Sequence, residues 1–247
     1  MTKQTAAFFD IDGTLFRNSL LIEHFLLLAQ VDKKASKLWE EEIKPLYEKY
    51  KNRQGAFEEY LDKAAVLYKD ALIGLDKQTI EEIAEVVINS NKHKTYNLTR
   101  KRVAWHLAQG HRVFFISGSP SFLVDDFAKH FKIDEAVSTI YEFDNNDIFT
   151  GGIIPMWDNR SKLDAIKKLT KKYDIDLETS YSYGDTNGDI TMMEMVGNPT
   201  AINPSWELLD KLNGDESIRD KATIAIERKD VNYSFKLSDM VVDCRKF

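Results

Sequence analysis

The sequence predicts an α/β protein with a doubly wound, mainly parallel sheet and an inserted all-helical segment. Short apolar runs, typical of buried parallel strands, alternate with amphipathic helical patterns from residue 97 onward. Ahead of this alternation, a first apolar run is followed by a long stretch whose apolar residues recur at helical spacing. The chain of 247 residues is long enough for one large core with such an insertion.

The first strand is predicted over residues 5–11, where small and apolar residues form a continuous run. Residues 17–93 are expected to form a helical cap domain, in which Pro45 divides one of the helices. The α/β core is then expected to consist of residues 1–16 and 94–247.

The remaining elements follow from the periodicity of apolar residues and from turn residues between the segments. In chain order they are a helix at 97–109, a strand at 112–117, a helix at 121–131, a hairpin of strands at 136–143 and 148–154, a helix at 161–174, a strand at 179–184, a helix beginning near 188, and strands at 198–203 and 222–228. The pattern of the last twenty residues is ambiguous.

Composition excludes some function classes and leaves others open. With 34 Lys and Arg against 40 Asp and Glu, the net charge of −6 gives no electrostatic reason to expect nucleic acid or an anionic membrane as a partner. Cys244 is the only cysteine, so an intrachain disulfide is impossible, which agrees with a reducing compartment. The N-terminal residues lack the pattern of a signal peptide, and a cytoplasmic location is expected. The oligomeric state stays open.

Polar residues stand where the predicted strands end or where a helix begins beside them. They are Asp10, Asp12, Ser117, Gly118, Lys162, Asp185 and Asp189. Taken singly, each has an ordinary structural explanation as a turn residue, a helix cap or a surface lysine. In doubly wound sheets, however, ligands bind beyond the carboxyl ends of the strands, so these residues are expected to share one crevice.

The residue types in this set indicate phosphoryl transfer. Carboxylates gathered at one point repel one another unless a cation lies between them, and oxygen ligands suit Mg²⁺. Asp10 and Asp185 are the natural direct ligands, while Lys162 and main-chain amides near Ser117 would hold an anion. Since side chains two positions apart in a strand face the same way, Asp10 and Asp12 are expected to act on one phosphate. One would attack phosphorus, and the other would handle the proton of the leaving oxygen.

The motifs "DIDGTLF", "FFISGS", Lys162 and "GDTNGD" resemble, in this order, the four motifs of the haloacid dehalogenase superfamily of phosphatases that use an aspartate nucleophile. The resemblance covers the whole chain. It implies a Rossmann-like core, and the place of the helical cap is similar to that in the subclass that contains phosphoserine phosphatase.

For the catalytic residues, the resemblance implies that Asp10 is the nucleophile that becomes an aspartyl phosphate. Asp12 would protonate the leaving alcohol and then activate the attacking water, and its main-chain carbonyl would contact Mg²⁺. Asp185 would complete the metal ligands. Asp189 would hold either a water on the metal or Lys162.

For the phosphate, the resemblance implies that Ser117 and Lys162 bind the phosphoryl oxygens with help from the amides of Gly13 and Gly118. Two departures disfavour phosphoserine itself as the substrate. Ser19 and Asp62 stand where phosphoserine phosphatases have a glutamate and an arginine that recognise the amino acid.

The sequence therefore predicts a Mg²⁺-dependent phosphomonoester hydrolase that acts on a small phosphorylated metabolite. A phosphotransferase or phosphomutase with the same intermediate is the alternative, and a non-catalytic sensor of phosphorylated ligands is a more distant one. Dehalogenation is disfavoured because Asp12 has little purpose when the leaving group is a halide. Met156 and Trp157 follow the hairpin near Lys162, and core packing is the favoured interpretation over a place at the pocket.

Overall fold

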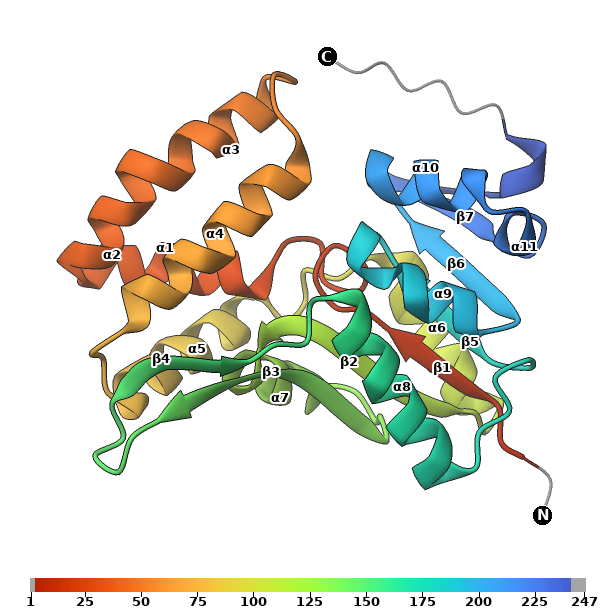
Figure 1. The fold of residues 1–247 in the computed structure, drawn as a ribbon, viewed down its shortest axis with the longest axis horizontal. Helices are drawn as coiled ribbons and strands as arrows, with labels where there is room; N and C mark the ends of the chain where they lie inside the picture. Colours follow the sequence, from red (N-terminus) through yellow and green to blue (C-terminus); the bar gives the residue numbers. More distant parts are fainter. Residues whose placement is uncertain (1–2, 241–247) are drawn as a thin grey trace.

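The sheet of the protein has eight strands in the order β4-β3-β2-β1-β5-β6-β7-β8 (Figure 1). This computed structural model of the chain describes residues 3–240. Neighbouring strands from β3 to β7 run parallel, whereas β4 and β8 lie antiparallel at the two edges. The strands are β1 (Ala6–Phe9), β2 (Arg112–Pro120), β3 (Glu135–Phe143), β4 (Phe149–Ile154), β5 (Tyr181–Gly184), β6 (Asn198–Ile202), β7 (Thr223–Arg228) and β8 (Val231–Lys236). The predicted doubly wound, mainly parallel sheet is thus confirmed.

The helices fall into two groups along the chain. Those between β1 and β2 are α1 (Leu20–Val31), α2 (Lys33–Leu38), α3 (Lys44–Lys51), α4 (Phe57–Leu72), α5 (Lys77–Asn91) and α6 (Asn97–Ala108), with a π-helical turn at Trp39–Ile43. Those after β2 are α7 (Ser121–Ala128), α8 (Asn159–Tyr173), α9 (Ile190–Met195), α10 (Trp206–Gly214) and α11 (Glu216–Arg219), with short 3-10 turns at Asn187–Asp189 and Leu237–Asp239.

Both faces of the sheet are buried, which explains the continuous apolar run of its central strand. Phe8 stacks on Phe114 and packs toward α8 and α9, while Phe9 stacks on Tyr183 and packs toward α6 and α7. Successive side chains of β1 therefore serve opposite cores, and none of them is exposed.

The helical insertion has an apolar core of its own, in which Phe25, Trp39 and Tyr68 pack together. Helix α5 belongs to both cores, because Ile80 packs with the insertion whereas Ala84 and its neighbours on the same face pack under the sheet. The β3–β4 hairpin also contributes side chains to the core of the insertion. The expected domain division at residues 17–93 stays a prediction.

Several element boundaries differ from those predicted. Strand β1 ends at Phe9 rather than at residue 11, and β2 continues to Pro120 with a register shift after Ser117. Strand β8 and helices α10 and α11 were not predicted. Pro45 lies in the first turn of α3, directly after the π-helical turn that separates α3 from α2, so the helical stretch is divided next to the proline as predicted. Cys244 lies outside the described residues. Within 3–240, every helix is too short or too polar to cross a membrane.

Candidate active site

Two of the predicted site residues, Asp10 and Asp185, lie at the carboxyl ends of β1 and β5, which are adjacent in the sheet. Asp10 directly follows β1, and its main-chain N–H still donates to the carbonyl of Tyr183 in β5 at 2.9 Å. Asp185 directly follows β5. From β1 the chain winds first toward β2 and β3 and later toward β5 and β6, so this position is the switch point where ligands bind in such sheets.

Lys162 lies in the first turn of α8 and joins two of the predicted acids. Its ammonium donates to Asp10 Oδ1 at 2.8 Å and to Asp189 Oδ1 at 2.6 Å. The three side chains are 4%, 8% and 0% exposed, so they form a buried charge cluster. Burial alone would lower the pKa of Lys162, but the carboxylates of Asp10 and Asp189 raise this pKa above its usual value. The lysine is therefore charged at neutral pH.

Asp189 is held on both sides by donors and orients the lysine. Its Oδ1 accepts from Lys162, and its Oδ2 accepts from the main-chain N–H groups of Asp185 and Thr186 at 3.0 and 3.1 Å. The Thr186 side chain completes a reciprocal capping box over this turn. A methyl group on Gly184 would lie 2.4 Å from Asp189 Cβ, so the strand end itself needs glycine for Asp189 to fit.

Asp185 is positioned by the loop that follows β1. Thr14 Oγ1 donates to Asp185 Oδ1 at 2.8 Å. Gly13 has a φ of +79°, and a Cβ there would lie 2.0 Å from Asp185 Oδ2. Burial raises the pKa of Asp185, and repulsion from Asp10 adds to this effect. Burial likewise raises the pKa of Asp10, although Lys162 opposes it.

The carboxylates fit a divalent metal ion. Oxygen atoms of Asp10, Asp185 and Asp189 all lie within 4.8 Å of one another, in a buried position. Both oxygens of Asp189 already accept hydrogen bonds, whereas Oδ2 of Asp10 and Oδ2 of Asp185 accept none from the described residues. Asp10 and Asp185 are thus the side chains with an oxygen to offer, and a hard cation such as Mg²⁺ would offset the repulsion between them.

Asp12 lies outside this carboxylate cluster. Its Oδ1 accepts from the main-chain N–H of Leu20 at 2.5 Å, and its Oδ2 accepts from Ser117 Oγ at 3.2 Å. Burial raises the pKa of Asp12, and the hydrogen bonds it accepts oppose that shift. The sequence analysis assumed that Asp10 and Asp12 both lie in a strand, where side chains two positions apart face the same way. This assumption is wrong, because β1 ends at Phe9. Asp12 is placed instead by the start of α1 and the end of β2.

Ser117 is fully buried, and its Oγ also accepts from the main-chain N–H of Ser119 at 3.1 Å. Gly118 lies against the loop that precedes α8, since a Cβ there would be 2.9 Å from Trp157 Cβ. A Cβ on Gly188 would be 2.8 Å from the carbonyl of Trp157. Trp157 therefore lies between two of the motif loops with 42% of its surface exposed, and the expectation of core packing for it is wrong.

The sequence analysis did not anticipate the contacts that two residues make at this site. Thr14 stands inside a recognised motif but received no role, and its bond to Asp185 spans 171 positions. Glu58 of α4 accepts from the main-chain N–H of Asn187 and from Ser205 Oγ, across 129 and 147 positions. No local pattern signals such distant pairs.

The two residues that depart from the phosphoserine enzymes have other tasks here. Ser19 is the N-cap of α1, where its Oγ accepts from the N–H of Ile22 at 3.4 Å. Asp62 lies on the exposed side of α4. Neighbouring side chains still shield its carboxyl group in part from water, which raises its pKa.

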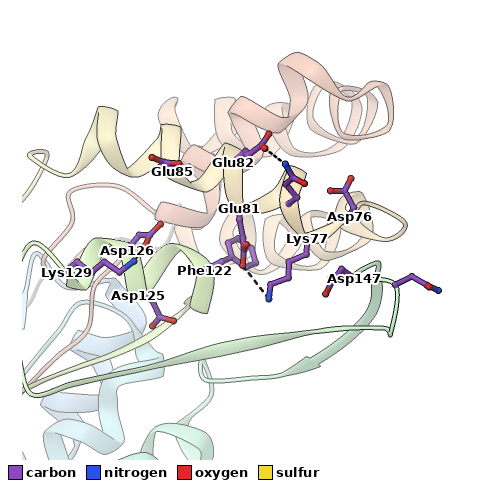
Figure 2. Close-up of a pocket in the computed structure, with 12 residues that line it drawn as sticks. Asp76, Lys77, Glu81, Glu82, Glu85, Phe122, Asp125, Asp126, Lys129 and Asp147 are labelled. Carbon is purple, nitrogen blue, oxygen red and sulfur yellow. Dashed lines mark hydrogen bonds and ion pairs between the residues drawn. The ribbon is translucent and has the colours of Figure 1, made fainter.

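A cavity lies elsewhere in the described part of the chain. Figure 2 shows this space of about 880 Å³ between α5, α7 and the β3–β4 turn. Most of the side chains that line it are acidic, and Phe122 also lines it. None of the residues predicted for the site lines this cavity.

Comparisons with known proteins agree with this geometry. The family model of the haloacid dehalogenase-like hydrolases matches residues 7–194. A putative hydrolase of Mycobacterium leprae is 27% identical over 208 residues, which cover 82% of this chain and 68% of that protein. A phosphoserine phosphatase of Mycobacterium tuberculosis, SerB1, is 27% identical over 82% of this chain and 66% of its own length. The chain thus spans about two thirds of the length of these relatives.

Solved structures share the fold at low sequence identity. A protein of unknown function from Bordetella pertussis has a TM-score of 0.67 at 22% identity, covering 86% of this chain and 96% of that one. A phosphoserine phosphatase solved as an analogue of the phospho-aspartyl intermediate has a TM-score of 0.62 at 21% identity, covering 93% and 96%.

The chain belongs to the haloacid dehalogenase-like hydrolases. The expectation of an enzyme of this family with a Rossmann-like core is therefore confirmed, and its phosphatase relatives agree with the expected reaction class.

Proposed function

We propose that the protein is a Mg²⁺-dependent phosphomonoester hydrolase that forms an aspartyl phosphate on Asp10. The observation that carries this proposal is the buried contact of Lys162 with Asp10, beside Asp185, at the switch point of the sheet. A carboxylate with one unbonded oxygen, a fixed ammonium and a second carboxylate are the groups that phosphoryl transfer requires.

The residues divide the reaction between them. One carboxylate oxygen of Asp10 would attack phosphorus as the bond from phosphorus to the leaving oxygen breaks, and Asp12 would give its proton to that oxygen. Asp12 would then take a proton from water, whose oxygen attacks the same phosphorus and releases Asp10 and inorganic phosphate. Lys162, Ser117 and the amides of Gly13 and Gly118 would hold the phosphoryl oxygens.

Asp10 and Asp185, with the main-chain carbonyl of Asp12, would hold the metal ion. When bound, Mg²⁺ supplies positive charge that offsets the charge of the phosphate. Asp189 would fix Lys162, which agrees with the hydrogen bonds to both of its oxygens.

For the substrate, we propose a small phosphorylated metabolite. A relative 27% identical is named phosphoserine phosphatase. Against phosphoserine itself stand Ser19, which caps α1, and Asp62, whose carboxylate is exposed and would repel a substrate carboxylate. Net charge gives no reason for a nucleic-acid or membrane partner, and the expected cytoplasmic location stays a prediction.

A turnover assay with p-nitrophenyl phosphate and Mg²⁺ tests the reaction class. Asp10→Asn should lose activity by about a thousandfold or more, because a neutral amide is a poor nucleophile. Asp164→Asn, which changes an exposed acid of α8, is the control and should keep full activity. Near-normal turnover by Asp10→Asn would refute the assignment.

Released phosphate across a panel of phosphorylated metabolites, phosphoserine included, identifies the substrate. Strong selective activity on phosphoserine would overturn the substrate proposal. Addition of alcohols to the same assay separates hydrolysis from phosphotransfer, because a transferase would form new phosphate esters instead of inorganic phosphate.

A further inference from the structure

Glu58 reaches out of the helical insertion to the core. It lies in the first turn of α4, where an acidic side chain ordinarily stays near the unpaired N–H groups of its own helix. Instead its Oε1 accepts from Ser205 Oγ at 2.7 Å and from the main-chain N–H of Asn187 at 3.2 Å. The side chain is half-buried, as are both of its partners.

Both partners are connected to the turn that carries Asp185 and Asp189. Asn187 lies in the turn between Asp185 and Asp189. Ser205 donates its main-chain N–H to the carbonyl of Asp185 at 2.7 Å and caps α10 with its side chain. One carboxylate of the insertion is therefore bonded to the turn that places both acids and to the segment that supports it.

The insertion is also attached to the core just beyond the last turn of α4. There the main-chain N–H groups of Gly74 and Lys77 donate to Phe149 and Asp147 of the β3–β4 hairpin. Helix α4 ends beside β4, and its first turn lies at the far end of the helix (Figure 1). Among residues 3–240, Glu58 is the one side chain of α2, α3 or α4 with a hydrogen bond or ion pair to any segment beyond β4.

We propose that Glu58 is a positioning residue that fastens the start of α4 to the turn carrying Asp185 and Asp189, and that release of this contact opens the crevice to substrate. The attachment at the hairpin end would act as the hinge, because it remains when the Glu58 contact breaks. The role in turnover depends on the proposed function, whereas the contact and its opening do not.

Amide hydrogen exchange at Asn187 measures the contact directly, because Glu58 is the acceptor of that N–H. In Glu58→Ala, exchange at Asn187 should rise by about tenfold or more, while the amides of Phe8 and Phe114 in the central strands keep their protection. Glu58→Gln should retain most of the protection, since its amide oxygen can accept both bonds. Glu59→Ala, which removes the exposed neighbouring carboxylate, is the matched control and should change nothing.

The kinetic readout uses p-nitrophenyl phosphate with saturating Mg²⁺. Glu58→Ala should lower kcat/KM by about fivefold or more, whereas Glu58→Gln and Glu59→Ala should stay within about twofold of the parent protein. Unchanged exchange at Asn187 in Glu58→Ala would overturn the proposal, whatever the activity. Faster exchange at Asn187 with an unchanged kcat/KM would overturn the claim that release of the Glu58 contact controls access of substrate to the crevice. Because exchange is measured without turnover, either result is distinguishable from failure of the proposed reaction.

Discussion

The ammonium of Lys162 lies 2.8 Å from a carboxylate oxygen of Asp10, although 152 positions separate the two residues in the chain. The same ammonium lies 2.6 Å from Asp189. All three groups are buried, so their charges are compensated by one another and little by water. Loss of the single cation would leave two buried carboxylates unpaired.

Lys162→Met is therefore expected to destabilise the protein by about 3–5 kcal/mol, the cost of breaking a buried ion pair from one side. The free energy of unfolding in urea, without added metal, is the quantity to measure. Lys167→Met is the matched control, because Lys167 is exposed on the same helix, and its effect should be within about 0.5 kcal/mol of zero. Equal effects from the two substitutions would contradict the buried network.

Gly13→Ala is expected to cost more stability than Gly110→Ala. Both glycines have positive φ, +79° and +74°, which costs an alanine about 1–2 kcal/mol. A Cβ at Gly110 would meet nothing within 4 Å, whereas a Cβ at Gly13 would collide with Asp185 Oδ2. Urea unfolding of the two variants isolates the collision, which should add more than about 1 kcal/mol. A smaller loss at Gly13 than at Gly110 would show that Asp185 can move aside.

Mg²⁺ is expected to stabilise the folded protein, because it binds carboxylates that are gathered only in the folded state. At a concentration about a hundred times its Kd the gain would be about 2.7 kcal/mol, visible as a higher Tm. Asp185→Asn should abolish most of this shift, and Asp164→Asn should preserve it. If Mg²⁺ leaves the Tm of the parent protein unchanged, the proposal that these carboxylates bind the metal is wrong.

A buried histidine makes stability depend on pH. His24 Nε2 contacts the carbonyl of Ile80 at 3.0 Å, so this nitrogen carries the proton, and Nδ1 accepts from Tyr68 Oη at 3.0 Å. Burial lowers the pKa of His24 to about 4, although the bond to Ile80 opposes it. In the unfolded chain the pKa is about 6.5, so between these values only the unfolded state binds the proton.

Stability should therefore fall as the pH drops from about 6.5 toward 4, by up to about 3 kcal/mol from this one residue. Urea unfolding across this pH range in the parent protein and in His24→Gln tests the assignment. In the variant, the free energy of unfolding should depend less steeply on pH, and the difference in slope should correspond to nearly one bound proton. Parallel curves would mean that His24 titrates normally in the folded protein. His106, whose pKa burial also lowers to about 3, contributes equally to both curves.

The sheet could be predicted from the sequence wherever burial leaves a pattern. The run at Ala6–Phe9 is apolar throughout because its side chains enter two cores in alternation. Strand β8 was not predicted, although Val231, Tyr233 and Phe235 alternate with polar residues along it. All six of its side chains are exposed, so the alternation does not mark a buried face. It is held at the edge of the sheet by antiparallel main-chain pairing with β7.

The sequence predicted those site residues whose positions follow from the ends of parallel strands. Asp10 and Asp185 come together because β1 and β5 are neighbours, which the rule for doubly wound sheets anticipates. The bond from Thr14 to Asp185 and the reach of Glu58 to Asn187 depend on how loops and the insertion settle in three dimensions. The orientation of Asp12 was predicted from a strand that is shorter in the structure. Its carboxylate is positioned instead by hydrogen bonds from the main-chain N–H of Leu20 and from Ser117 Oγ.

The central claim is that Asp10 accepts the phosphoryl group, and mass spectrometry of the protein quenched in acid during turnover tests it most directly. The account predicts one added phosphoryl group on the peptide that contains Asp10, present with p-nitrophenyl phosphate and Mg²⁺ and absent in Asp10→Asn. A phosphoryl group on another residue, or steady turnover by Asp10→Asn, would contradict it.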